Sequence, residues 1–260
     1  KTYDTWQQGF LQILQAVQKD RVFVTKVYHS ISREHIENYL YRLTYDLMIG
    51  VVEEKAAGMT VRPEDKEFIA NFYKYAFVGP SIRPATENIE KTHDVLIYIS
   101  MGTVNNDLLP FYRACIAAFA DSPYQVILST GEQIDRSALG TLPDNITALP
   151  HVDQIAVLQK ADVFLSHCGM NSASESLYFG VPLVLFPQTS EQGGVASRVA
   201  ELGAGLKLEK AGAASIRTAV DAVLQTPSYC ANAQKIRESF LRCGGAKAAV
   251  DKILSVADRK

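Results

Sequence analysis

One stretch of the chain combines small, polar and imidazole side chains directly after a short apolar run: Ser166-His167-Cys168-Gly169-Met170-Asn171-Ser172. Gly169 permits a tight turn, and Asn171 and Ser172 are residue types that favour the cap of a helix. A helix N-terminus carries unpaired N–H groups and partial positive charge, which suit a diphosphate. His167 can donate to a phosphate oxygen. Taken alone, the pattern favours the simpler interpretation, a capped helix beside a buried histidine.

Two further groups bear hydroxyls or a carboxylate at places where a ligand could be held. Glu175 follows the first stretch by about one helical turn, and one carboxylate can accept hydrogen bonds from two vicinal hydroxyls, as acidic residues do for ribose. Ser100, Gly102 and Thr103 follow another apolar run, where glycine lets the backbone approach a ligand and hydroxyls can hydrogen-bond a phosphate. By themselves, residues 100–103 are equally consistent with a simple tight turn.

A third polar segment, residues 187–193, contains Glu191 and Gln192, which offer acceptors and donors for sugar hydroxyls. Alone it is typical of a loop that caps the next helix. The three segments matter together, because each follows an apolar run and each carries groups compatible with phosphates or hydroxyls.

The elements that would position these residues alternate along the chain. The continuous apolar run at 95–99 indicates a strand buried on both faces, and further strands are expected at 126–128, 146–149, 163–165, 183–186 and 205–208. Helical spacing occurs at 108–120, 155–160, 173–179, 195–202, 215–224, 229–242 and 247–257. This alternation predicts an α/β fold, a Rossmann-like parallel sheet with right-handed crossovers. Ligands bind such sheets beyond the carboxyl ends of the strands, so we expect the three polar segments to share one edge.

The first part of the chain has a different character. Residues 1–76 are helix-rich, with apolar residues at helical spacing in 5–17 and 36–55 and a candidate strand at 22–27. No motif there suggests chemistry, and packing helices are the simplest interpretation. Residues 77–94 contain a Gly-Pro turn and a polar run, which predict a linker, so we expect the α/β domain to occupy 95–260.

Composition excludes several classes of protein. The chain has 260 residues, 47% of them hydrophobic, with a net charge of −2 and no block of like charge, which argues against a nucleic-acid partner. No apolar run reaches the roughly 20 residues of a membrane helix, so we expect no stable membrane insertion. The four cysteines form no Cys-x-x-Cys pair or zinc spacing, and we expect reduced, buried thiols in a cytoplasmic protein.

The block from Ser166 to Glu175, followed by Gly180-Val181-Pro182 and by 187–192, resembles the donor-binding signature of UDP-glycosyltransferases. These are GT-B enzymes of glycosyltransferase family 1, and the likeness is to the bacterial macrolide-type branch. Residues 77–81, 100–103 and 142–145 also fit that branch. The resemblance covers 77–260 and implies the C-terminal half of a GT-B fold, with 1–76 a helical remnant of the N-terminal acceptor-binding domain.

The resemblance assigns roles to individual residues. Glu175 would bind the ribose hydroxyls, Val152 and Gln154 would flank the uracil, and Glu191 and Gln192 would contact the sugar. The diphosphate would be held by side chains and backbone amides of Ser100, Gly102, Thr103, His167, Gly169, Met170, Asn171 and Ser172.

The implied reaction is transfer of a hexose, with glucose expected, from a UDP-sugar to a hydroxyl of a small lipophilic acceptor such as a macrolide or flavonoid, with inversion. Neither a metal nor a further cofactor is implied. In this family the catalytic base is a histidine after the first strand of the N-terminal domain, and His29, His35 and His93 do not lie in that context. The base is therefore unassigned. We expect the chain to represent part of an enzyme, with helix 247–257 crossing back to the first domain.

One departure from the family pattern lies beside the predicted uracil site. The family often has Val-Pro-Gln, and this chain has His151-Val152-Asp153-Gln154. Asp153 thus stands where a stiff proline is usual, and only His151 is left as a stacking surface.

Other functions fit the same residues. A non-catalytic UDP-sugar-binding module, or a subunit that needs a partner for the acceptor half, would use the same donor site without a base. A relative acting on lipid-linked intermediates and a UDP-sugar epimerase are further alternatives. The oligomeric state is left open.

Overall fold

The computed structural model describes residues 82–102 and 108–243, together with isolated positions between 42 and 66. The chain divides into two compact units, one being Ile82–Ser239 and the other comprising Lys1–Ser81 and Phe240–Lys260. The described positions within the predicted helix 36–55 are helical. The predicted helices 5–17 and 247–257 and the predicted strand 22–27 lie outside the described residues.

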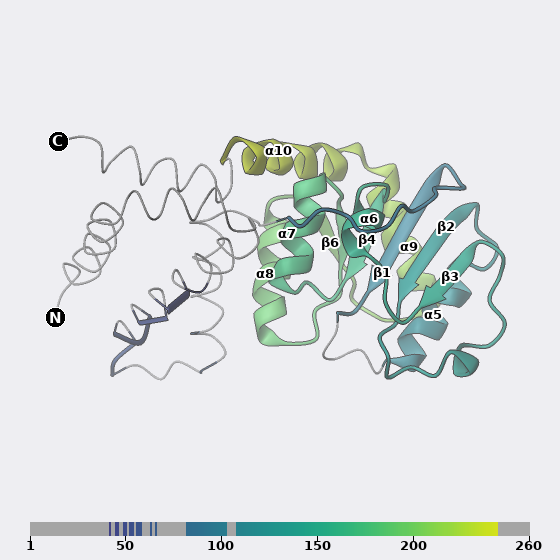
Figure 1. Cartoon of the computed structure of the whole chain (residues 1–260), viewed down its shortest axis with the longest axis horizontal. Helices are drawn as coiled ribbons and strands as arrows, with labels where there is room; N and C mark the ends of the chain where they lie inside the picture. Colours follow the sequence, from purple (N-terminus) through teal and green to yellow (C-terminus); the bar gives the residue numbers. More distant parts are fainter. Residues whose placement is uncertain are drawn as a thin grey trace. The chain divides into compact units, whose positions relative to one another are not determined.

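The predicted parallel sheet is confirmed. Six strands, all paired in parallel, lie in the order β3-β2-β1-β4-β5-β6 (Figure 1). The strands are β1 (Val95–Ser100), β2 (Tyr124–Ser129), β3 (Ile146–Leu149), β4 (Val163–Ser166), β5 (Leu183–Leu185) and β6 (Gly205–Lys207). Every residue of β4 and β5 is buried, which explains why these strands read as continuous apolar runs.

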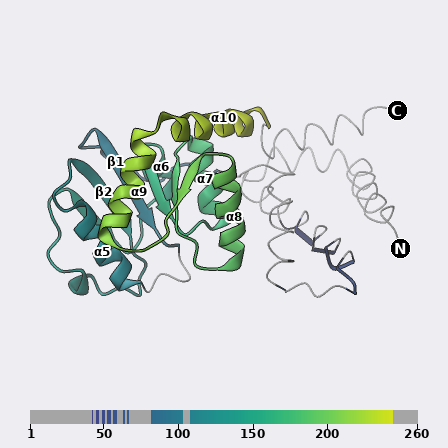
Figure 2. The ribbon, with the colours of Figure 1, turned by 180° about the vertical axis from the view of Figure 1, so that it is seen from behind.

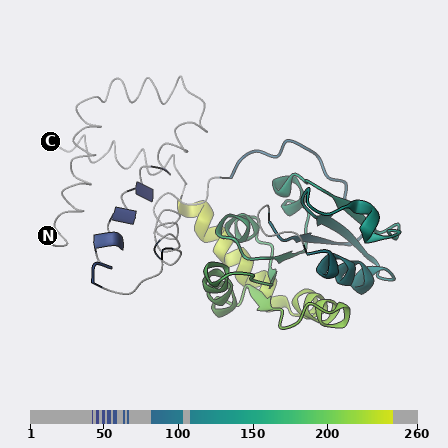
Figure 3. The same cartoon turned by 90° about the horizontal axis from the view of Figure 1, so that it is seen from below.

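Helices cover both faces of the sheet, as Figure 3 shows from below. They are α5 (Leu109–Phe119), α6 (Gln154–Leu158), α7 (Met170–Phe179), α8 (Ser190–Glu201), α9 (Ala213–Gln225) and α10 (Pro227–Cys243). Helices α5 and α9 lie together on one face, the one turned to the viewer in Figure 2. Along β1, Ile97 and Ile99 join the core beneath them, and Tyr98 points the other way and stacks on Phe164 with 4.6 Å between ring centroids.

Three predictions about the elements were wrong in detail. Helix α7 begins at Met170, earlier than predicted, and α8 begins at Ser190, so polar first turns hid both helix starts. Glu191 and Gln192 therefore lie in the first turn of α8 and not in a loop before it. The short 3-10 helix η1 (Arg136–Leu139) was not predicted.

The cysteines only partly follow the prediction of buried thiols. Cys115 and Cys168 are buried and free, and burial raises the pKa of the Cys168 thiol to about 12. Cys230 is free but exposed, on the outer side of α10. Within the described residues, every helix is too short or too polar to span a bilayer.

Strand order places a topological switch point between β1 and β4. The chain runs from β1 outward to β2 and from β4 outward to β5 on the other side, so the connections after these two neighbouring strands diverge. This reversal is the switch point at which doubly wound sheets bind ligands.

Candidate functional site

His167 lies at the switch point, between two glycines that follow different strands. A Cβ atom on Gly102 would lie 2.7 Å from His167 Cε1, and one on Gly169 would lie 2.5 Å from His167 Nε2. Neither distance is tolerable for a side chain, so the imidazole occupies the space that both glycines leave. Gly102 also has a φ of +80°, which favours glycine independently.

The imidazole of His167 is half-buried and has an unusual environment. Its Nδ1 is buried and, among the described residues, has no hydrogen-bond partner. Burial lowers the pKa of His167, and a hydrogen bond with the Ser100 backbone opposes this only in part. A buried ring nitrogen without a hydrogen-bond partner is costly unless a ligand completes it. This feature separates His167 from the satisfied core histidine that its sequence context favoured.

The start of α7 lies beside this ring and carries no side-chain cap. Gly169 is the N-cap, so the first amides of the helix receive nothing from its side chain. The prediction that Asn171 and Ser172 cap the helix was wrong, because they are its second and third residues. Cys168 has a φ of 66°, a left-handed conformation that is rare outside glycine and that often marks ligand sites. Its amide donates to Ser166 Oγ at 3.1 Å.

The loop after β1 is described as far as Gly102. Ser100 is 6% exposed, and its Oγ accepts a hydrogen bond from the Gly102 amide at 3.3 Å, so the hydroxyl shapes this turn. Thr103 lies outside the described residues.

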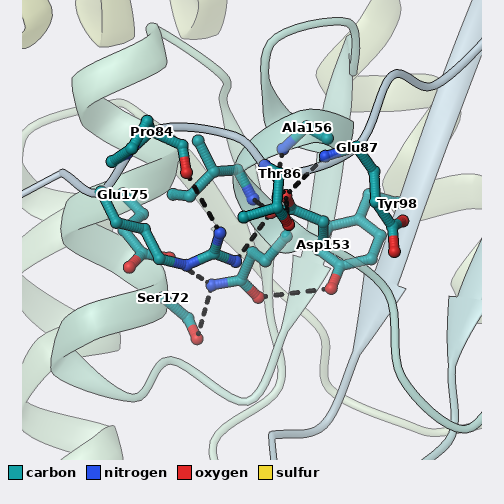
Figure 4. Close-up of polar contacts among 11 residues, drawn as sticks. Pro84, Thr86, Glu87, Tyr98, Asp153, Ala156, Ser172 and Glu175 are labelled. Atoms are coloured by element: carbon teal, nitrogen blue, oxygen red, sulfur yellow. Dashed lines mark hydrogen bonds and ion pairs between the residues drawn. The ribbon is translucent and has the colours of Figure 1, made fainter.

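Gln154 and Glu175, which were predicted to contact the nucleoside, are joined by a hydrogen bond, and Gln154 also bonds to Ser172, which was predicted to hold the diphosphate (Figure 4). Gln154 Nε2 donates to Glu175 Oε2 at 2.5 Å and to Ser172 Oγ at 3.4 Å. The hydroxyl of Tyr98, from β1, donates to Gln154 Oε1 at 3.3 Å. Gln154 thus links the start of α6 to the first two turns of α7.

Glu175 is the titratable member of this group. Burial raises its pKa, and the hydrogen bond from Gln154 and the charge of Arg83 oppose that rise. When such a partly desolvated carboxyl is ionised, it is a strong hydrogen-bond acceptor for paired hydroxyls.

The sugar-contacting residues and the base-flanking residue Val152 are less closely tied to this centre. Gln192 Oε1 accepts a hydrogen bond from the backbone amide of Gln188 at 2.7 Å. The backbone amide of Gln192 donates to Thr189 Oγ1 at 3.4 Å. Within 82–102 and 108–243, no hydrogen bond joins Glu191 or Gln192 to His167 or Glu175. Both still lie at the carboxyl edge of the sheet, because α8 follows β5 directly. Val152 is half-buried, next to Gln154.

Two other histidines lie away from His167. His151 is exposed after β3, and its Nε2 lies 3.2 Å from Glu132 Oε1. His93 pairs with its neighbour Thr92, with 2.9 Å between Nδ1 and Oγ1.

Asp153 is the residue whose importance sequence reasoning missed. It is 7% exposed, and its carboxylate caps α6 by accepting from the amides of Ile155 and Ala156. The same carboxylate accepts from Arg83 Nη2 at 2.7 Å and from the Thr86 amide at 2.6 Å. An aspartate directly before a short helix is a recognisable capping signal. Nothing in the sequence indicated its second set of partners, Arg83 and Thr86, which lie far back in the chain.

Comparison with known proteins relates more than half of the chain to glycosyltransferases. Residues 114–253 match the family model described as "Erythromycin biosynthesis protein CIII-like, C-terminal domain". Residues 4–92 match a different one, "Transcriptional regulator C-terminal region".

Three individual proteins show the likeness. The NDP-glycosyltransferase YjiC of Bacillus subtilis (strain 168) is 41% identical over 69% of this chain and 47% of its own length. The oleandomycin glycosyltransferase of Streptomyces antibioticus is 31% identical over 61% of this chain and 37% of its own. The crystal structure of the calicheamicin glycosyltransferase CalG4 matches with a TM-score of 0.64 and 27% identity, over 81% of this chain and 59% of that one.

The chain spans about half the length of the curated relatives it matches, for example 47% of the Bacillus subtilis protein. The family model covers more than half of the chain, and the sheet order and helix arrangement agree with a GT-B neighbour. The chain therefore belongs to the erythromycin biosynthesis protein CIII-like glycosyltransferases of the macrolide type, whose C-terminal Rossmann-like domain it carries.

Proposed function

We propose that this chain binds a UDP-sugar at the β1–β4 switch point and supplies the donor half of a glycosyltransferase site. One observation carries the proposal: the uncapped start of α7 and the buried, unpartnered Nδ1 of the half-buried His167 lie at the same point. Both features are unfavourable in a ligand-free core, and a diphosphate would relieve both.

The described contacts suggest how the donor would be divided among the residues. The α7 amides from Met170 to Ser172, with His167, would hold the diphosphate. Glu175 would accept from the ribose hydroxyls, and Gln154 with the backbone of Val152 would flank the uracil. Glu191 and Gln192, at the start of α8, would contact the hexose.

The proposed reaction moves the hexose, with glucose preferred, onto a hydroxyl of a small lipophilic acceptor. The acceptor oxygen would attack the anomeric carbon while the bond from that carbon to the diphosphate oxygen breaks, which inverts the configuration. The proton of the hydroxyl would pass to a base in the acceptor-binding half. The α7 dipole would stabilise the charge that develops on the leaving diphosphate, so we propose no metal requirement. The name of the oleandomycin enzyme supports a natural-product acceptor.

Calorimetry with UDP, uridine and dTDP tests the donor site directly. We expect UDP to bind more tightly than uridine, which lacks the diphosphate. UDP should also bind more tightly than dTDP, whose sugar lacks the 2′-hydroxyl that would donate a hydrogen bond to Glu175. The binding should persist in EDTA. Undetectable binding of all three nucleotides by the folded chain would refute the proposal.

A non-catalytic donor-binding module is the second candidate. It is favoured by residues 4–92, which match a model drawn from transcriptional regulators and not from glycosyltransferases. The two candidates separate in a UDP-release assay with UDP-glucose and a panel of macrolide and flavonoid acceptors. UDP release that is faster with an acceptor than the hydrolysis of UDP-glucose without one supports the enzyme. Tight UDP binding without such release supports the module. For either we propose a cytoplasmic location, where the free thiols stay reduced.

A further inference from the structure

Residues 82–94 form neither helix nor strand, yet they are tied to three distant parts of the domain. Lys91 Nζ lies 2.7 Å from Asp162 Oδ2, and the Thr92 amide donates to Gln125 Oε1 at 2.8 Å. The third tie, at Asp153, is the most extensive. This segment is therefore held along the domain and does not behave as the free linker that its polar composition suggests.

Asp153 uses both carboxylate oxygens in this tie. Oδ2 accepts from the Thr86 amide at 2.6 Å, from Thr86 Oγ1 at 2.8 Å and from the Glu87 amide at 3.3 Å. Oδ1 accepts from Arg83 Nη2 at 2.7 Å, and Arg83 Nη1 reaches the carbonyl oxygen of Pro84 at 3.4 Å. Burial by itself raises the pKa of Asp153, but the hydrogen bonds from Arg83 and Thr86 outweigh it and hold the pKa well below its usual range.

These contacts fix a backbone conformation that proline would otherwise impose. Asp153 has a φ of −66°, the value to which a proline ring locks the chain. The family pattern often has proline here, and aspartate has no ring to hold this angle. The next residue, Gln154, bonds to Glu175, so freedom at Asp153 would move Gln154 within the nucleoside site.

Arg83 also acts on the site through its charge. Its attraction lowers the pKa of Glu175, and the carboxylate of Asp153 raises it. No other charged residue lies on α7, and Tyr98, which faces Glu175 from β1, is kept neutral by its own burial. Among the described groups that act on Glu175, Arg83 is therefore the cation whose charge, together with the hydrogen bond from Gln154, opposes the rise in the pKa of this carboxyl.

We propose that Arg83 is a positioning residue for the nucleoside end of the donor site. It clamps Asp153 in a proline-like conformation that presents Gln154 to Glu175, and its charge favours the ionised form of Glu175. The inference rests on the proposed function for its ligand, but the clamp itself exists without one.

The test uses the full chain and Arg83→Gln, which keeps length and polarity but removes the charge. The carboxyl of Glu175 is titrated by NMR in the ligand-free protein, and UDP and uridine affinities are measured by calorimetry. We expect the Glu175 titration to move to higher pH, and both affinities to fall about tenfold, as for a lost hydrogen bond to a charged group. Equal losses for UDP and uridine would place the effect at the nucleoside end.

Lys91→Gln is the matched control, because Lys91 lies in the same segment but pairs with Asp162. It should change neither the Glu175 titration nor the affinities. Arg83→Lys should keep the Glu175 titration near that of the unaltered chain, because the charge remains, and should recover only part of the affinity, because the forked donor is lost.

The outcomes separate this inference from the proposed function. If the unaltered chain fails to bind UDP while Arg83→Gln shifts the Glu175 titration, the proposed function fails and the clamp stands. If Arg83→Gln leaves the Glu175 titration unchanged, or lowers thermal stability alone, the inference is overturned. Should Arg83→Gln fail to fold, Arg83→Lys provides the test. A Glu175 titration in Arg83→Lys that is clearly displaced from that of the unaltered chain would overturn the inference equally.

Discussion

Helices α6 and α7 both start at the carboxyl edge of the sheet, after β3 and β4, but their N-termini are treated in opposite ways. At α6 a buried carboxylate, that of Asp153, accepts from two helix amides and from the preceding segment. At α7 the cap is Gly169, which offers no side chain. The α8 start resembles α6, because Thr189 Oγ1 accepts from the Gln192 amide.

The difference separates a helix start whose amides are satisfied by a side chain of the protein from one whose amides are not. A helix N-terminus attracts negative charge whatever its role in the molecule. At α6 that charge belongs to the chain and stabilises the fold. At α7 that negative charge is absent, and the half-buried ring of His167 with its buried, unpartnered Nδ1 lies beside the same amides. An uncapped helix start together with an unsatisfied polar atom is a more specific sign of a ligand than either feature alone.

The comparison would be broken most strongly by giving α7 the carboxylate that α6 has. Gly169→Asp should weaken UDP binding by at least about 3 kcal/mol, roughly a hundredfold, because the carboxylate would replace the diphosphate and its Cβ would displace the ring of His167. Calorimetry with UDP measures the loss. Gly193→Ala, a helical glycine of α8 with open space around it, is the matched control and should bind UDP normally.

The opposite change removes the carboxylate from α6. Asp153→Ala should lower the free energy of unfolding by about 3 kcal/mol, since a cap and several charged hydrogen bonds are lost together. Urea denaturation measures this. Asp135→Ala, at the exposed cap of η1, should cost well under half as much.

Acid should reproduce part of the Asp153 effect. The folded-state pKa of Asp153 lies below its unfolded value of about 4, so its stabilisation is complete above that pH and is lost as the pH falls through the folded-state pKa. Asp153→Asn should flatten this acid limb of the stability profile. An unchanged limb in that variant would assign it to other carboxyls.

His167→Ala would sharpen the assignment of α7 to phosphate. We expect UDP to lose about 2 kcal/mol of binding free energy and uridine to lose almost none, because only the diphosphate would reach the imidazole. Equal losses for the two ligands would show that His167 does not contact phosphate.

The smallest expected effect separates binding from stability at Glu175. Its folded-state pKa is raised, so ionising it as the pH rises past about 4 destabilises the fold, and Glu175→Gln should be slightly more stable than the unaltered chain at pH 7. The same variant should weaken UDP by about 1–3 kcal/mol, because a charged acceptor is lost. A variant that is both less stable and unchanged in UDP affinity would remove Glu175 from the site.

The sequence by itself determined the parallel sheet and most of the residues at its edge. Buried strands such as β4 can be recognised in the sequence as apolar runs. Glycines such as Gly169 mark places where a larger residue would not fit. The block from Ser166 to Glu175 was enough to indicate the family, because its residues are contiguous.

Tertiary structure decided the features that depend on contacts between distant segments. Only the fold places His167 between Gly102 and Gly169, leaves its Nδ1 without a partner and joins Arg83 to Asp153. Capping residues are chosen by local geometry and by long-range partners together, so residue type alone wrongly assigned the α7 cap to Asn171 and Ser172 and missed the second role of Asp153. Local pattern thus fixes which groups reach the edge of the sheet, and packing across the sheet fixes which of them remain without a hydrogen-bond partner.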